Sequence, residues 1–356
     1  MVSEGGRVQL ESKALPRPLQ SRAGWPWMTN PSDCAPEVQG AADWPRITVV
    51  TPSFNQGQFL EETIRSVLMQ GYPNLEYIIM DGGSRDSSID VIRHYAAWLS
   101  HWESAKDNGQ ADAINRGFAR GTGQILAWLN SDDVYRPGAL FAVAKCFLAD
   151  PGLSIAYSTC ETIDGNSICH AIHVPPEFSV YGLLKNNFIA QPATFLSRSL
   201  WEVIGLNANR HYAFDYEMWI KAAVQGYRFA RVSGAPWAGF RVWEQSKSET
   251  SYDKFVQEMT AIAMEVFGGG TLSADLQPLK GLALASGWRF AALGYWGSGQ
   301  GTKARSCVRQ IFRLWPKSFL EPKLWFLYLT SFGGKGVTTG VRTLKRGVNK
   351  RWHRSA

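Results

Sequence analysis

Three short apolar runs, each followed by polar residues, set the pattern of the middle of the chain. They are the β-branched residues 47–51, residues 77–80 and residues 125–129. Runs of this length and composition are typical of buried strands. An amphipathic helix is expected after the first run, and residues 106–117 are expected to begin the helix before the third. Strands that alternate with helices indicate βαβ units and a mostly parallel α/β sheet.

The residues that follow these runs are candidates for a ligand site. Residues 130–133 (Asn-Ser-Asp-Asp) follow the third run, and Asp81 follows the second. In open α/β sheets ligands bind beyond the carboxyl ends of the strands, where an Asp commonly hydrogen-bonds a nucleoside. Adjacent carboxylates there would hold a divalent cation, and the cation would hold a diphosphate. The alternative is that Asp132 and Asp133 only cap a helix that starts near Pro137.

Five segments, in unbroken order between about residues 46 and 250, resemble the family 2 inverting glycosyltransferases. They are residues 51–88, 107–133, 191–195 (QPATF), 214–223 (FDYEMWIKAA) and 240–249 (FRVWEQSKSE). The resemblance implies a GT-A domain, Rossmann-like with a mixed, mostly parallel sheet, that binds a nucleotide-sugar. It further implies transfer of a sugar, with UDP-sugar the first choice of donor, to an acceptor hydroxyl with inversion. Bacterial polysaccharide or glycolipid assembly on a lipid-linked or saccharide acceptor is the expected setting, with Mg²⁺ or Mn²⁺ as cofactor.

The resemblance also carries a set of site residues onto this sequence. The residues implied for donor binding are Thr51, Pro52, Ser53, Asn55, Asp81, Asn108, Gly109, Asn115, Asn130, Ser131, Asp132, Arg241 and Lys247. Asp132 is the first implied metal ligand and Asp133 the second. Gln191 and Trp219 are implied on the acceptor side, although residues 191–195 also fit a plain strand and turn.

An acceptor hydroxyl needs a general base, and the resemblance implies Asp215 for this role, with Glu217 as its substitute. The alternative is that Asp215 is an N-cap and Glu217 a first-turn acid of a helix. Two departures from the family pattern bear on the metal. Asn130 stands where a carboxylate is usual, and Trp243, which cannot be a ligand, stands where relatives often have His. We therefore expect lower metal affinity, or a metal ion that arrives with the nucleotide.

Composition divides the chain into three parts. Residues 1–44 are rich in Pro, Ser, Gly and charge and are predicted to be a loosely ordered leader. Three tryptophans are expected to dock its end on the next domain: Trp25, Trp27 and Trp44. Residues 45–268 are predicted to form the GT-A domain. Residues 269–356 are predicted to form a basic, aromatic-rich region with helices at residues 282–296, 302–315 and 322–332.

The positive charge of the chain is concentrated at its end. Residues 303–356 hold thirteen Lys and Arg against the single acid Glu321, a net +12, whereas the whole chain carries +7. Aromatic residues are interleaved with these cations, and such segments bind anionic membrane surfaces. A solvated basic face is the alternative. No segment resembles a base-reading module, so nucleic acid is not expected as a partner.

The compartment is predicted to be the cytoplasm, with peripheral attachment at the inner face of the cell membrane. The five cysteines include no C-x-x-C pair and fit a reducing compartment. Neither a signal peptide nor a run of about 20 apolar residues is recognised. Zinc held by residues among Cys160, Cys169, His170 and His173 is an alternative to plain packing.

Two other functional classes remain open from the sequence. A nucleotidyltransferase would also bind a nucleotide and a metal, but it would normally show a Gly-rich loop near the first strand, which residues 51–55 lack. A noncatalytic docking protein that keeps the GT-A fold is the second alternative. The intact Asp81, Asp132, Asp133 and Asp215 argue against it.

Overall fold

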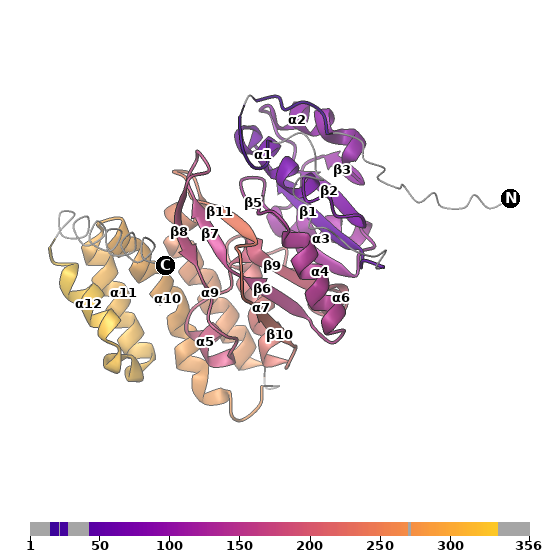
Figure 1. Ribbon diagram of the computed structural model, residues 1–356. Coiled ribbons are helices and arrows are strands. Elements are labelled where there is room, and N and C mark those ends of the chain that lie inside the picture. Colours follow the sequence, from indigo (N-terminus) through magenta and orange to yellow (C-terminus); the bar gives the residue numbers. More distant parts are fainter. Residues whose placement is uncertain (1–14, 21, 28–42, 270–271, 334–356) are drawn as a thin grey trace, which may run out of the picture. The chain divides into compact units, whose positions relative to one another are not determined.

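The computed structural model describes residues 15–20, 22–27, 43–269 and 272–333 (Figure 1). The chain splits into two compact units. The sheet unit comprises Met1–Phe178 and Ile189–Val242, and the helical unit comprises Ser179–Phe188 and Trp243–Ala356. The predicted boundary at residue 268 therefore differs from the observed one, since residues 243–268 group with the C-terminal helices.

A seven-stranded sheet forms the core of the sheet unit, in the order β10-β6-β9-β4-β1-β2-β3. Its strands are β1 (Ile47–Ser53), β2 (Leu75–Asp81), β3 (His101–Ser104), β4 (Ile125–Trp128), β6 (Ile155–Ser158), β9 (Thr194–Ser197) and β10 (Phe229–Val232). Only β9 runs antiparallel to its neighbours, β4 and β6. The sheet is therefore mixed but mostly parallel, as predicted, and all three predicted strands are present.

The register of the central strands brings their carboxyl ends to one edge. Ser53 at the end of β1 lies opposite Asp81 at the end of β2. On the other side of β1, Val50 pairs with Trp128, two residues before Asn130. The three polar segments predicted from the sequence consequently emerge side by side, because neighbouring parallel strands deliver their following loops to the same edge.

From this edge the chain continues into a second sheet, which has four strands in the order β5-β11-β7-β8. Its strands are β5 (Val134–Tyr135), β7 (Cys160–Ile163), β8 (Cys169–His173) and β11 (Ala238–Arg241). β5 starts directly after Asp133, and β11 pairs with it antiparallel, Gly239 opposite Val134. β11 is thereby placed next to the loop that carries the two carboxylates.

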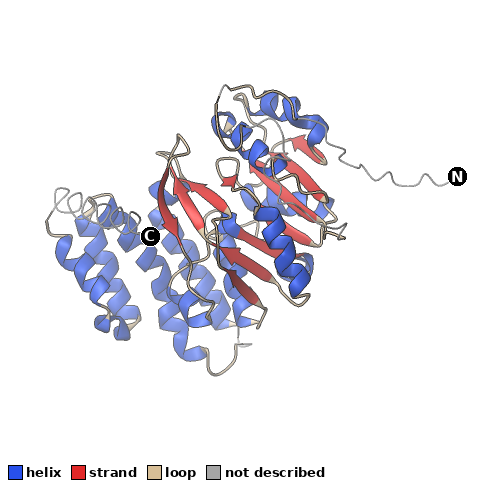
Figure 2. Cartoon of the chain, viewed as in Figure 1, coloured by secondary structure: helices blue, strands red, loops and turns tan. Residues whose placement is uncertain are grey.

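Helices flank the strands of the sheet unit, as Figure 2 shows in blue and red. They are α1 (Gly57–Leu68), α2 (Ser88–Tyr95), α3 (Gln110–Arg120), α4 (Ala139–Ala149), α6 (Arg198–Ile204) and α7 (Phe214–Val224). α1 buries Leu60, Ile64 and Val67 in the core beside β1, as its helical spacing requires. Gly117 lets α3 lie close on β1, since a Cβ there would be 2.5 Å from Val50 Cγ1.

The helical unit confirms the predicted C-terminal helices. Its helices are α5 (Val180–Lys185), α8 (Lys247–Thr250), α9 (Tyr252–Gly268), α10 (Lys280–Gly297), α11 (Gly301–Leu314) and α12 (Pro322–Thr330). α10 packs against both α9 and α11. Gly287 permits the first of these contacts, because a Cβ there would be 3.1 Å from the Cα of Val256. This packing, which composition does not reveal, groups α9 with the C-terminal helices.

The end of the predicted leader docks on the sheet unit, as expected. Trp25 Nε1 donates to the Tyr135 carbonyl at 2.8 Å, Trp27 is buried, and the Trp44 ring lies 5.4 Å from that of Phe141. Residues 1–14, 21 and 28–42 of the predicted leader lie outside the described residues.

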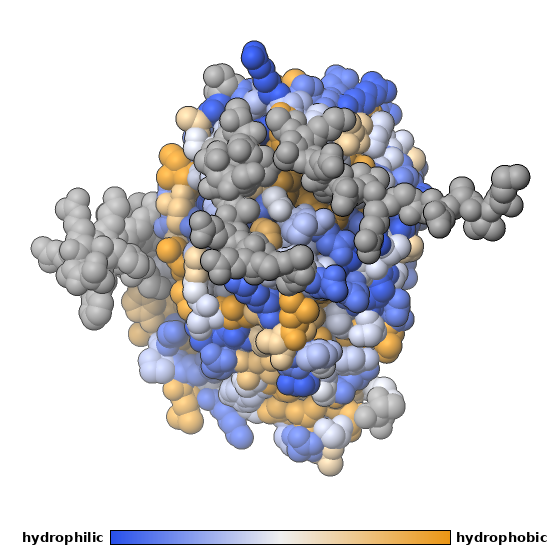
Figure 3. Space-filling view, turned by 45° about the vertical axis from the view of Figure 1, so that its right-hand side comes forward, coloured by the Kyte–Doolittle hydropathy of each residue, from blue (hydrophilic) through white to orange (hydrophobic). Residues whose placement is uncertain are grey.

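The described surface mixes polar and apolar residues. The face drawn in Figure 3 shows hydrophobic residues (orange) among hydrophilic ones (blue). Among the described residues, no helix is long and apolar enough to span a membrane.

Candidate active site

The loops that follow β1 and β2 are tied together by Asn55. Its backbone N donates to Ser84 Oγ at 2.8 Å, and its Oδ1 accepts from Arg85 N at 2.8 Å. Asn55 has a φ of +52°, a left-handed conformation that Asn tolerates better than most residues. The side chain predicted to bind the donor thus also shapes the edge at which the donor would lie.

Asp81 organises the second loop. Its buried carboxylate accepts hydrogen bonds from Gly83 N at 3.1 Å, from Ser84 N at 2.8 Å and from Ser104 Oγ at 2.7 Å. A nucleoside would reach this carboxylate by sharing or exchanging one of these bonds, so the nucleoside contact of Asp81 stays a prediction.

The residues at the end of β1 divide between core and edge. Thr51 is fully buried and its hydroxyl lies 3.0 Å from the Tyr77 hydroxyl, so its side chain belongs to the core. Pro52 is also buried. Ser53, opposite Asp81, has a buried Oγ with no hydrogen-bond partner among the described residues. Ser53 is therefore the β1 residue with an unused hydrogen-bonding group at the edge.

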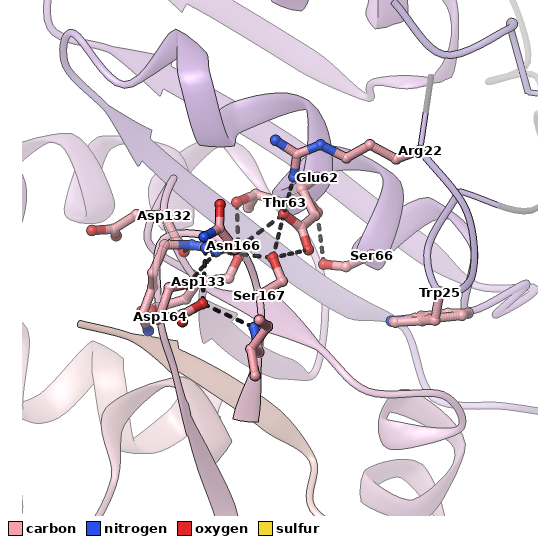
Figure 4. Close-up of polar contacts among 12 residues, drawn as sticks. Arg22, Trp25, Glu62, Thr63, Ser66, Asp132, Asp133, Asp164, Asn166 and Ser167 are labelled. Atoms are coloured by element: carbon pink, nitrogen blue, oxygen red, sulfur yellow. Dashed lines mark hydrogen bonds and ion pairs between the residues drawn. The ribbon is translucent and has the colours of Figure 1, made fainter. Parts of the chain in front are cut away.

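The two adjacent carboxylates of the third loop have different surroundings. Asp133 is 1% exposed, and its oxygens accept from Arg241 N at 2.8 Å and Asn130 Nδ2 at 3.2 Å. Burial and the neighbouring Asp132 charge raise the pKa of Asp133, against the opposing effect of Arg241. Asp132 is half-buried, and Figure 4 shows its carboxylate turned away from the contacts that hold Asp133. Of these two carboxylates Asp132 is the more accessible, and its contact with a ligand stays a prediction.

Arg241 supports the Asp132 loop from the interior of the protein. This position contradicts the donor-binding role predicted for Arg241. Its side chain is 0% exposed and forms an ion pair with Glu62 at 3.1 Å. Its Nε donates to the Asp132 carbonyl at 2.6 Å, and its Nη1 donates to Ser167 Oγ at 2.9 Å. A guanidinium so enclosed does not face a diphosphate. It fastens β11 and α1 to the Asp132 loop instead.

This buried pair gives a first prediction. Arg241→Met is expected to lower the free energy of unfolding by about 3–5 kcal/mol, because it removes the fully buried cation of Glu62 and leaves the partly exposed Arg22 as the ion-pair partner of that carboxylate. Denaturant unfolding measures the change. Arg231→Met is the matched control, since the Arg231–Glu177 pair lies at the surface with Glu177 76% exposed, where about 0–1 kcal/mol is expected. Equal losses in the two variants would contradict the role given to Arg241.

Asn130 connects the Asp132 loop to Gln191, the residue predicted on the acceptor side. Its Oδ1 accepts from Gln110 Nε2 at 2.6 Å, and its Nδ2 donates to Gln191 Oε1 at 3.3 Å. Gln191 Nε2 in turn donates to the Trp128 carbonyl at 2.7 Å. The amide of Asn130 also donates to Asp133, which an ionised carboxylate at position 130 would not do. Gln110, at the start of α3, was not predicted as a site residue.

Ser131 is hydrogen-bonded to Thr63 in α1 and to Gln56, the residue just before that helix. Its Oγ donates to Gln56 Oε1 at 2.7 Å, and its carbonyl accepts from Thr63 Oγ1 at 3.0 Å. Thr63 also donates to the Asp133 carbonyl at 2.7 Å. The side chain of Ser131 is therefore buried in the support of the loop, with Asp132 as the projecting residue.

The three residues predicted around the start of α3 differ in exposure and in contacts. Asn108 is exposed, and Gly109 has a φ of +107° that glycine favours. Asn115 is half-buried with both ends of its amide engaged: its Nδ2 donates to the Leu206 carbonyl at 2.7 Å and its Oδ1 accepts from Trp201 Nε1 at 3.0 Å. Asn115 therefore supports the end of α6, which corrects its predicted donor contact.

His211 is a neighbour of this region that sequence reasoning missed. A Cβ on Gly109 would lie 3.1 Å from His211 Nδ1, so the exposed imidazole lies against the start of α3. It stands in the loop just before α7, four residues ahead of Asp215. No sequence motif marked it, because its proximity to Gly109 depends on the fold.

The three predicted residues of α7 have three different positions. Asp215 is half-buried in the first turn, where its Oδ1 accepts from Tyr216 N at 2.7 Å. Trp219 is fully buried and stacks on Trp128 at 5.9 Å. This burial corrects the prediction that Trp219 lines the acceptor side, and makes it a core residue.

Glu217 is enclosed by polar partners. Burial alone would raise its pKa, but hydrogen bonds from Lys221, Asn207 and Arg210, with the charge of Lys221, lower it. Lys221 Nζ lies 2.6 Å from Oε1 and Arg210 Nε lies 3.1 Å from Oε2. An acid with a lowered pKa and both oxygens engaged is a weak proton acceptor. It anchors the loop before α7, and the role of Asp215 as base stays a prediction.

The last predicted segment, residues 240–249, enters the helical unit at Trp243. Lys247 is exposed at the start of α8, and Trp243 N donates to Ser246 Oγ at 3.0 Å. The donor contact of Lys247 stays a prediction.

The residues present suit a metal ion that shares its ligands with a nucleotide. Among the described residues, no group of three or more His, Cys, Asp and Glu is arranged to hold a metal. Mg²⁺ commonly uses one or two carboxylates and completes its shell with phosphate oxygens and water. Asp132 fits this arrangement, whereas the enclosed oxygens of Asp133 do not.

The fold is that of the GT-A class, with the polar edge at the carboxyl ends of its central strands. Residues 48–200 match the family model described as glycosyl transferase family 2. An uncharacterized glycosyltransferase of Nostoc sp. is 33% identical over 130 residues, covering 34% of this chain and 38% of that protein. The putative teichuronic acid biosynthesis glycosyltransferase TuaG of Bacillus subtilis is 27% identical over 188 residues, covering 51% and 74%. The chain thus spans well under half the length of the Nostoc relative.

Solved structures share the fold at low identity. S. aureus TarS 1-349 in complex with UDP-GlcNAc superposes with a TM-score of 0.57 and 16% identity, covering 84% of this chain and 92% of that one. The mannosyltransferase PcManGT of Pyrobaculum calidifontis, in complex with GDP-Man and Mn²⁺, gives 0.54 and 18%, covering 87% and 88%. The chain carries a family 2 glycosyltransferase domain with the GT-A fold, which confirms the resemblance seen in the sequence.

Proposed function

We propose that the protein moves a sugar from a nucleoside diphosphate sugar, first of all a UDP-sugar, to an acceptor hydroxyl with inversion. The observation that carries this proposal is the single edge at which the loops of Asn55, Asp81 and Asp132 meet, with Gln191 tied to the last of them. The nucleotide-sugars held by TarS and PcManGT support a donor of this class.

Asp132 is the residue that we propose for holding Mg²⁺ or Mn²⁺ together with the diphosphate. A bound ion there supplies neutralisation of the negative charge that develops on the leaving diphosphate. The Arg241 and Thr63 contacts to the backbone of the loop keep Asp132 at the edge. The Mn²⁺ in the PcManGT complex supports the choice of ion.

Asp215 is the proposed base that accepts the proton of the acceptor hydroxyl. It is half-buried in the first turn of α7, at the position that the family resemblance implies for the base. The hydroxyl attacks the anomeric carbon on the face opposite the departing diphosphate. One displacement of this kind inverts that carbon.

The acceptor is proposed to be a saccharide or a lipid-linked saccharide in bacterial polysaccharide or glycolipid assembly, at the cytoplasmic face of the cell membrane. The assignment of TuaG to teichuronic acid biosynthesis supports a polysaccharide. The basic end of the chain supports a site near anionic lipid.

Inversion has a direct test. NMR of the product formed from an α-linked UDP-sugar is expected to show a β-linkage, because a single displacement reverses the anomeric configuration. A product with the configuration of the donor would contradict a one-step transfer with Asp215 as base.

A further inference from the structure

We propose that the described end of the helical unit docks on an anionic lipid bilayer through one apolar surface with a basic rim. The apolar surface, here the α12 face, consists of Phe319, Leu320, Trp325, Phe326, Leu329 and Phe332. This proposal assigns a contact surface to the membrane location proposed above, and it rests on that location. Sugar transfer is tested separately.

The α12 face concentrates exposed apolar side chains. Six of the sixteen exposed large apolar residues in the described part of the chain fall within residues 319–332. Leu320 is 85% exposed, and Leu329 and Phe332 are each 63% exposed. Contiguous exposed apolar residues of this kind mark interaction surfaces more often than single ones do.

The rings of this face are fixed against one another. Phe319 stacks on Phe312 at 4.2 Å, and Trp325 lies 5.1 Å from Phe312. Tyr328 follows at 6.2 Å from Trp325, and Phe332 at 5.7 Å from Tyr328. Because packing already orders these rings, a partner that covers them has less side-chain entropy to remove.

Cations border the rings. The Arg305 guanidinium lies 4.1 Å from the Phe332 ring, and Arg309 lies 5.7 Å from the Tyr328 ring and donates to its hydroxyl at 3.1 Å. Lys317 and Lys323 are exposed at η5 (Pro316–Leu320) and at the start of α12.

The only acid among residues 303–333 does not neutralise this rim. It is Glu321, which pairs with Arg289 at 2.9 Å and with Lys185 at 3.0 Å. The rim therefore keeps its positive charge toward a partner.

These features favour lipid over other polyanions. Rings and arginines would also suit an anionic saccharide or single-stranded nucleic acid, but Leu320 and Leu329 offer neither of them a stacking surface. Aliphatic side chains beside aromatic ones, with cations at the rim, match the boundary between acyl chains and phosphates. Residues 334–356 hold seven Lys and Arg and no acid and add to the positive charge that favours anionic lipid.

The apolar part of the surface is tested by sedimentation of the full chain with vesicles of phosphatidylglycerol and phosphatidylcholine. Leu320→Ser with Leu329→Ser is expected to lower the partition coefficient at least about tenfold, because two exposed leucines no longer enter the acyl boundary. The control pair Leu148→Ser with Val203→Ser removes side chains of 50% and 67% exposure from the sheet unit and is expected to bind as wild type.

The charged rim is tested in the same assay. Lys317→Gln with Lys323→Gln is expected to lower partition about 30-fold, at roughly fivefold for each cation near the surface. Arg93→Gln with Lys145→Gln removes the same charge from exposed positions of the sheet unit and is the control. Binding of the wild type is expected to vanish largely at 1 M salt, where the screening length is about 3 Å.

Three results would overturn the lipid surface. They are failure of the wild type to sediment with anionic vesicles, equal binding to pure phosphatidylcholine, and equal loss of binding in the control pairs. Loss of binding to a soluble polyanion, with vesicle binding unchanged in the same variants, would assign the surface to a saccharide or nucleic acid. UDP-dependent thermal stabilisation, measured on every variant, shows whether the sheet unit stays folded and keeps the vesicle result separate from the proposed sugar transfer.

Discussion

Asp215→Asn is expected to slow sugar transfer by about 10²–10⁴-fold, the usual contribution of a positioned base. Asn has nearly the same size as Asp but does not accept the proton of an attacking hydroxyl. UDP affinity should stay close to that of the wild type, because Asp215 lies in α7 and is not among the proposed donor contacts. Initial rates of product formation and a titration with UDP measure the two quantities separately.

Glu217→Gln is the informative companion variant. It weakens the ion pairs with Lys221 and Arg210, so it should lower thermal stability more than it lowers the rate per folded molecule. A stable Glu217→Gln protein without transfer, beside an Asp215→Asn protein of nearly normal rate, would exchange the two roles.

Asp132→Ala should remove the metal-dependent part of the stabilisation by UDP. In the wild type, UDP with Mn²⁺ at 100-fold over its dissociation constant should add about 2.7 kcal/mol to the free energy of unfolding, because the ligand binds only the folded state. Without the Asp132 carboxylate the metal ion loses its proposed protein ligand. Thermal unfolding with UDP, with and without Mn²⁺, measures the difference.

Asp90→Ala is the control for that experiment. Asp90 is a surface carboxylate of α2, with a side chain that is 79% exposed, so its loss should leave the metal-dependent shift unchanged. An Asp132→Ala protein that keeps the full metal-dependent shift would remove Asp132 as the ligand and with it the proposed metal site.

The sheet and its polar edge could be predicted because their signals are local. A β-branched run such as residues 47–51 indicates a strand from composition alone, and parallel strands place their following loops at one edge. The C-terminal helices were equally visible. The helices predicted at residues 282–296 and 302–315 correspond to α10 and α11, with nearly the same bounds.

The parts that sequence reasoning missed depend on contacts between distant residues. Arg241 resembles a phosphate ligand until its partner Glu62, 179 positions away, is seen to enclose it. Asn115 and Trp219 have the right residue types for a binding site, but the fold engages the Asn115 amide with Leu206 and Trp201 and buries Trp219 in the core. Burial is a property of the packed chain, and a motif does not report it.

The unit boundary was misplaced for a similar reason. The predicted boundary at residue 268 falls at the end of α9, next to Gly269 and Gly270, yet α9 packs on α10. Glycines mark where a chain can turn. They do not say which helices bury one another's surface.

The central claim is that the protein uses a nucleotide-sugar at the Asp132 edge, and release of nucleotide from a panel of such donors tests it most directly. The full chain with Mn²⁺ and no acceptor is predicted to release nucleoside diphosphate slowly from at least one donor, as water replaces the acceptor hydroxyl. EDTA and Asp132→Ala should each suppress that release. Formation of pyrophosphate from a nucleoside triphosphate and a sugar phosphate would indicate a nucleotidyltransferase instead. Binding of nucleotide-sugars without release from any donor, with or without saccharide acceptors, would contradict the account and leave a noncatalytic docking protein.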